Sequence, residues 1–122
     1  NATQAVQNFY GEDFSRDTTR EEALGKLKLS PDAKRLSAYI NNVEELTVYL
    51  TRLSGCVTAE ELALVVVSMV ESGTGINKEM MVKERFIKLL LPLAPGITSG
   101  RSIDNIRARI NGAWARRAKK RT

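Results

Sequence analysis

Helix start signals recur along this 122-residue chain, and they constrain its fold more than any other feature. A Ser, Thr or Asn side chain ahead of a helix accepts a hydrogen bond from a first-turn backbone N–H, which otherwise lacks a partner inside the helix. A Glu three residues later completes a reciprocal capping box. Residues suited to the cap position precede six segments: Thr19, Ser30, Asn42, Thr58, Asn77 and Ser102.

The segments behind these caps carry apolar residues at helical spacing, so the chain is predicted to be all-α. We expect a compact bundle of five to seven short helices that ends in a basic amphipathic helix. Residues 1–18 are expected to form a loosely ordered amino-terminal segment, and residues 19–114 a single helical domain. The predicted helices span about residues 19–28, 30–40, 42–54, 58–71, 78–91 and 102–121.

The segment 62–67 is the most apolar, and its β-branched residues leave a buried strand as an alternative. A helix is favoured because Thr58 and Glu61 have capping-box spacing, the segment exceeds ten residues, and no partner strand is evident elsewhere. A helix that is apolar on all sides usually lies at the centre of a core. Cys56, the single cysteine, is expected to be a small buried residue beside this helix.

The last predicted helix has an apolar face at 100° per residue, which we expect to dock on the core. This face consists of Ile103, Ile106, Ile110, Ala113 and Trp114. Asn105, Arg109 and Arg116 are expected on the opposite, outward side. Packing is predicted to end near Trp114, so that residues 115–122 form a basic flexible tail.

Positive charge is concentrated in residues 101–122, which hold eight Lys and Arg residues and a single acid, Asp104. The first hundred residues hold 11 basic and 13 acidic residues, so the net charge of +5 comes from the final segment. This asymmetry indicates a polyanionic or acidic partner.

A helix face that bears Arg and Asn suits the major groove of DNA. Arg pairs with the acceptors of guanine, Asn pairs with adenine, and flanking Lys and Arg neutralise phosphates. The sequence therefore predicts a small non-enzymatic DNA-binding protein, with Asn105 as a candidate for base contact. The candidate nucleic-acid-binding residues are Arg101, Asn105, Arg107, Arg109, Arg116, Arg117, Lys119, Lys120 and Arg121.

Residues 78–121 combine a helix, a Gly- and Pro-containing turn over 94–101 and an Arg-rich last helix. This order resembles small bacterial or phage DNA-binding regulators, and the resemblance implies a helix-turn-helix-like unit and a role in transcription regulation. The turn is longer than the three or four residues of a compact helix-turn-helix. Such regulators commonly dimerise, so a homodimer is a further partner to test.

Two other roles compete with DNA binding: a helical interaction module whose basic helix docks on an acidic protein surface, and a solubilising tail without a partner. Membrane attachment is disfavoured, because no apolar run approaches about 20 residues and the apolar stripe of the last helix is narrow. A cytoplasmic location is the simplest expectation, since the chain has one cysteine and no visible secretory signal.

Enzymatic chemistry is not expected, and no catalytic residue, metal ligand or cofactor is predicted. The chain has no histidine, which removes the commonest general base and metal ligand. The glutamate pairs at 21–22, 44–45 and 60–61 lie in predicted first turns, where acids suit the helix dipole, so we interpret them as capping residues. An enzyme that uses carboxylates or Lys alone is the remaining alternative.

Overall fold

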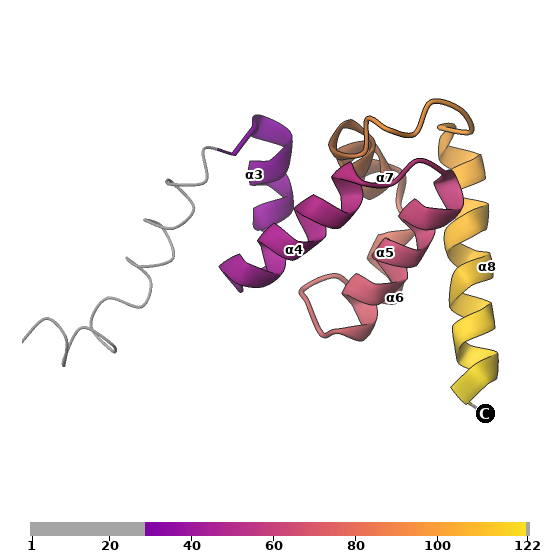
Figure 1. The fold of residues 1–122 in the computed structure, drawn as a ribbon. Coiled ribbons are helices and arrows are strands. Elements are labelled where there is room, and N and C mark those ends of the chain that lie inside the picture. The colour runs from indigo at the N-terminus through magenta and orange to yellow at the C-terminus, as the bar shows by residue number, and fades with distance from the viewer. Residues whose placement is uncertain (1–28, 122) are drawn as a thin grey trace, which may run out of the picture.

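The computed structural model describes residues 29–121, with side chains through Lys119, and this range is all-helical without a strand (Figure 1). The predicted fold class is confirmed. The expectations for residues 1–18 and for a helix starting at Thr19 lie outside the described residues. The described elements are α3 (Pro31–Ser37), α4 (Val43–Ser54), α5 (Ala59–Glu71), α6 (Lys78–Met81), α7 (Glu84–Leu90), the 3₁₀ turn η1 (Leu91–Leu93) and α8 (Ile103–Arg121).

Side-chain caps begin most of these helices, as the sequence predicts. Four cap residues each accept a hydrogen bond from the backbone N–H three residues later: Ser30, Asn42, Asn77 and Ser102. At α5 the box is reciprocal, because Thr58 Oγ1 accepts from Glu61 N at 3.2 Å and Glu61 Oε1 accepts from Thr58 N at 3.1 Å. Each cap satisfies a donor that the helix itself leaves unpaired.

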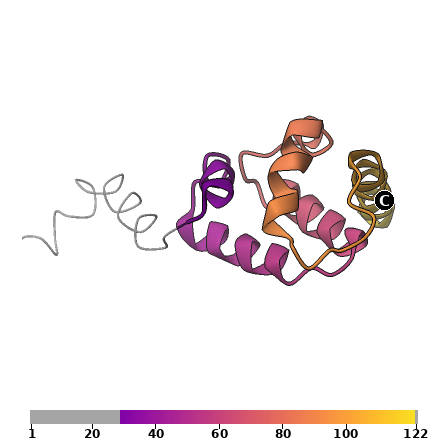
Figure 2. The same cartoon turned by 90° about the horizontal axis from the view of Figure 1, so that it is seen from above.

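Helix α5 lies at the centre of the fold, between α4 and α8 in both ribbon views (Figures 1 and 2). It is a helix rather than the alternative strand, and most of its apolar residues are buried, whereas Leu64 is exposed. The buried residues of α5 are Ala59, Leu62, Ala63, Val65, Val66, Val67 and Met69. Cys56, just ahead of α5, is also buried, and its thiol donates to the Arg52 carbonyl.

The single helix predicted over 78–91 is wrong, because the chain breaks between α6 and α7. At 100° per residue, Met81 and Leu90 would lie on opposite sides of one continuous helix. The break reorients the chain, so that both side chains are fully buried. The Val82 carbonyl, at the break, accepts a hydrogen bond of 2.9 Å from Arg107 Nε of α8.

Helix α8 forms one edge of the molecule and packs mainly against α5 (Figure 2). Its predicted apolar face is confirmed, since Ile106, Ile110 and Ala113 are buried, and Ile103 and Trp114 are partly buried against the core. The helical backbone continues past Trp114 to Arg121. Within residues 29–121, no helix is long and apolar enough to span a membrane.

Candidate nucleic-acid interface

Arg101, the first candidate residue, bonds to the main chain of the loop that leads into α8. One terminal nitrogen donates to the Ala94 and Ile97 carbonyls at 3.0 and 2.7 Å, and the other donates to the Leu91 carbonyl at 2.8 Å. The side chain is partly buried. This guanidinium therefore holds the η1–α8 loop in place by three charge-assisted hydrogen bonds.

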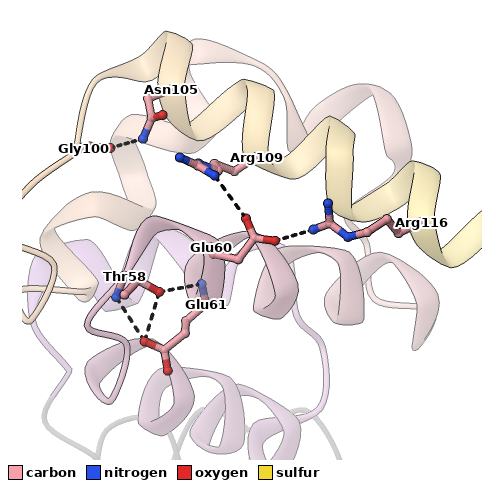
Figure 3. A network of polar contacts seen from close by, with 7 residues as sticks. All are labelled: Thr58, Glu60, Glu61, Gly100, Asn105, Arg109 and Arg116. Atoms are coloured by element: carbon pink, nitrogen blue, oxygen red, sulfur yellow. Dashed lines mark hydrogen bonds and ion pairs between the residues drawn. The ribbon is translucent and has the colours of Figure 1, made fainter.

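Asn105, the candidate for base contact, also holds this loop. Its Nδ2 donates to the Gly100 carbonyl at 2.6 Å (Figure 3). Gly100 has a φ of +69°, and a Cβ at this position would lie only 2.9 Å from Asn105 Nδ2. Glycine is needed here both for the left-handed backbone and for the close approach of the amide.

Arg107 lies on the flank of α8 that faces the break between α6 and α7. Besides its bond to Val82, it forms an ion pair of 3.0 Å with Asp104, one turn earlier on α8. The guanidinium thus joins α8 to a main-chain carbonyl that the interrupted helix leaves without an intrahelical donor.

Arg109 and Arg116 converge on a single carboxylate of α5, that of Glu60 (Figure 3). Arg109 lies 3.8 Å from Glu60 Oε2, and Arg116 donates to Glu60 Oε1. The two arginine side chains are 53% and 59% exposed, and the glutamate is 39% exposed. The site is therefore a surface ion-pair cluster.

The predicted position of Arg109 and Arg116 on the outward side of α8 is wrong. Arg109 lies only about 60° around the helix from the buried Ile106, and Arg116 lies about 20° from Arg109, seven residues on. Both therefore flank the packed stripe and face α5. Small residues occupy the outward side in their place, including Ala108 and Ala115, which are exposed.

Arg117 extends the contact between α8 and α5 beyond Trp114, where packing was predicted to end. It lies 3.2 Å from Glu71, whose side chain is only 18% exposed, at the carboxyl end of α5. That last turn has no basic residue of its own, and an acid there opposes the helix dipole. Arg117 supplies the positive charge that this helix end lacks.

The remaining candidates lie at the end of α8. Lys119 is exposed, whereas the side chains of Lys120 and Arg121 lie outside the described range. The arginines of α8 form ion pairs with three carboxylates, those of Asp104, Glu60 and Glu71. In these ion pairs, four arginines of α8 face three carboxylates.

Sequence reasoning missed the acids that face α8. Glu60 was interpreted as a capping residue together with Glu61, although only Glu61 has capping-box spacing from Thr58 and caps α5. Backbone N–H groups of Val57 and Thr58 bond to Glu61 and hold its pKa below the ordinary value. Glu71 carried a usable signal, because an acid in a last helical turn lacks support from the dipole.

Neither metal chemistry nor relatives provide a further assignment. Among the described residues, no three His, Cys, Asp or Glu side chains gather into a potential metal site. The chain matches no protein-family model, no curated protein and no solved structure. A functional assignment therefore depends on the geometry and charge of α8.

Proposed function

We propose that this protein binds duplex DNA through the phosphate backbone, using the arginines and lysines of α8. The observation that supports the proposal is the exposure of two paired arginines and of the acid that they share: the side chains of Arg109, Arg116 and Glu60 are 53%, 59% and 39% exposed. An exposed ion pair is worth only about 0–1 kcal/mol. A phosphate can therefore replace an exposed carboxylate at little cost, and counterion release favours the exchange.

The proposed contacts are with the phosphate backbone of DNA and not with its bases. The amide of Asn105 is bonded to Gly100, and the adjacent Ile106 is buried in the core. The connection from α7 to α8 contains η1 and a loop through Ser102, unlike the compact turn of a helix-turn-helix. A role in transcription regulation would then need base contacts from residues other than Asn105.

The test is a salt titration of the full chain binding to random-sequence duplex DNA. Affinity should fall steeply with salt, with a slope set by the number of neutralised phosphates. The triple variant Arg109→Gln, Arg116→Gln, Lys119→Gln should bind weakly and with a shallower slope. A matched control removes three exposed charges elsewhere, with Lys34→Gln, Arg35→Gln and Arg85→Gln, and should bind nearly as the wild type does.

Absence of binding at low salt would overturn the proposal. Equal losses in the two triple variants would show that only overall charge matters, which also contradicts a dedicated α8 surface. Circular dichroism and urea unfolding of both variants separate lost binding from lost folding.

One observation favours a second candidate, binding of an acidic protein surface. The arginines of α8 already pair with carboxylates, those of Glu60 and Glu71. Competition distinguishes the two partners: polyglutamate at equal charge concentration should displace DNA poorly if phosphates are preferred. Preferential binding of polyglutamate would support the protein partner instead.

A further inference from the structure

Two guanidiniums from successive parts of α8 bracket one carboxylate, each on a different oxygen. Arg109 faces Glu60 Oε2 and Arg116 bonds to Glu60 Oε1 (Figure 3). A nucleic-acid phosphodiester also shares one negative charge between two oxygens on one centre, and the donors of arginine match the geometry of both groups. The cluster thus has the charge and the donors of a phosphate site that is filled by a side chain of the same protein.

We propose that Arg109 and Arg116 form a binding site for one backbone phosphate of nucleic acid, and that the Glu60 carboxylate occupies this site in the free protein. The inference rests on the proposed DNA-binding function and adds a specific site with a built-in competitor to it. When DNA binds, two oxygens of a phosphate replace the Glu60 carboxylate at Arg109 and Arg116, and the Glu60 side chain turns toward water.

The surroundings of Glu60 allow this exchange. Helix α5 is started by the reciprocal bonds of Thr58 and Glu61, so its first turn stays capped when Glu60 leaves. Glu60 is 39% exposed, so its carboxylate becomes hydrated by a change of rotamer alone. The other acid that faces α8 differs: Glu71 is only 18% exposed, and its pair with Arg117 stays in place.

A purely organising role for Glu60 makes the opposite prediction. If the carboxylate served only to hold the two arginines in position, its removal would release them and weaken DNA binding. If it competes with phosphate, its removal strengthens binding. The sign of the change in affinity therefore distinguishes competition from organisation.

The experiment measures DNA affinity of the full chain at low salt for Glu60→Gln and for a matched control, Glu44→Gln. Glu44 is exposed and occupies the same second position of its helix, α4, so both variants lose one first-turn charge. Glu60→Gln should bind about three- to tenfold more tightly than Glu44→Gln, because one or two exposed ion pairs no longer need to be broken. Adding Arg109→Gln and Arg116→Gln should abolish this gain.

The outcomes separate the two proposals. If the wild type does not bind DNA at low salt, DNA binding fails and the site fails with it. If the wild type binds but Glu60→Gln does not exceed Glu44→Gln, only the competitor site is overturned. Replacing chloride by inorganic phosphate at constant ionic strength should leave the gain intact; selective loss of the gain would assign the site to free phosphate and overturn its assignment to the nucleic-acid backbone.

Discussion

The arginines at the two ends of α8 bond to different kinds of acceptor. At the amino-terminal end, Arg101 and Arg107 donate to main-chain carbonyls of the η1–α8 loop and of the α6–α7 break. Farther along, Arg109, Arg116 and Arg117 face carboxylates of α5. Both groups belong to the same basic segment in the sequence, and the fold divides their roles.

The two kinds of acceptor differ in how well water can solvate them after the arginine is removed. A partly buried carbonyl that loses its donor stays desolvated, at a cost of about 1–3 kcal/mol. An exposed carboxylate becomes hydrated again, so the loss is about 0–1 kcal/mol. Arg101 and Arg107 should therefore affect stability, whereas Arg109 and Arg116, which face the exposed Glu60, should affect ligand binding.

The largest expected effect is on stability, at the amino-terminal end. Arg101→Ala should lower the free energy of unfolding by roughly 1–3 kcal/mol, because three carbonyls lose a charged donor and only those of Leu91 and Ala94 keep a backbone N–H donor in the loop. Urea denaturation measures the change. The control Arg35→Ala removes an exposed pair with Asp32 and should cost under about 1 kcal/mol. Similar costs for the two variants would contradict the structural role of Arg101.

The next effect is on binding, at the end facing α5. Together, Arg109→Gln and Arg116→Gln should weaken DNA binding roughly tenfold at low salt, equal to about 1.4 kcal/mol. The slope of log affinity against log salt should become shallower by about one, because the two arginines share one phosphate. Stability should change by less than about 1 kcal/mol. A large loss of stability with unchanged binding would reverse the division between the two ends of α8.

A smaller effect tests the helix that presents Glu60. Thr58→Ala should destabilise the protein by about 1 kcal/mol, because the start of α5 loses its cap. Thr47→Ala is the matched control, since Thr47 is exposed within α4 and alanine is the better helix former there. Thermal unfolding of the two variants should differ in midpoint, with the Thr58 variant lower.

The acid in the capping box should affect the pH dependence of stability. The folded-state pKa of Glu61 is lowered, first by the backbone N–H of Val57, so its contribution is present above the unfolded pKa of about 4.3. This contribution is lost as the pH falls through the lowered folded pKa. As the pH falls from about 5 to 3, the free energy of unfolding should therefore decrease less for Glu61→Gln than for the wild type. Urea titration at each pH measures this difference.

The smallest expected effect belongs to Asn105. Asn105→Ala loses one hydrogen bond to Gly100 and should cost about 0.5–1 kcal/mol. In a competition assay, the Asn105→Ala variant should show the same preference among DNA sequences as the wild type. A changed preference would restore Asn105 as a base-contacting residue.

Much of the local structure was predictable because its causes are local. The cap residues act within three positions of themselves, and the apolar face of α8 follows from helical geometry. The break between α6 and α7 was predictable in principle, because Met81 and Leu90 point in opposite directions on a continuous helix. The number of apolar residues in this segment does not reveal the break, because a count carries no information about direction.

The candidate site was less predictable, because its partners are distant in the chain. The position of Arg109 about 60° from Ile106 was available from the sequence, but the helix that would cover this flank was not. Glu60 lies on α5, and its distance to Arg109 depends on how α5 and α8 pack. The same holds for Arg117 and Glu71.

By itself, the sequence determined the all-helical fold of residues 29–121, the caps that begin most of the helices there, the docking face of α8 and the concentration of positive charge in residues 101–122. Only the tertiary structure decided which arginines bond to carbonyls and which face carboxylates. Helix formation and charge content depend on neighbouring residues, whereas the partner of a long side chain depends on the packing of helices far apart in sequence. The basic segment is therefore two sets of arginines, separated by the acceptors that the fold provides.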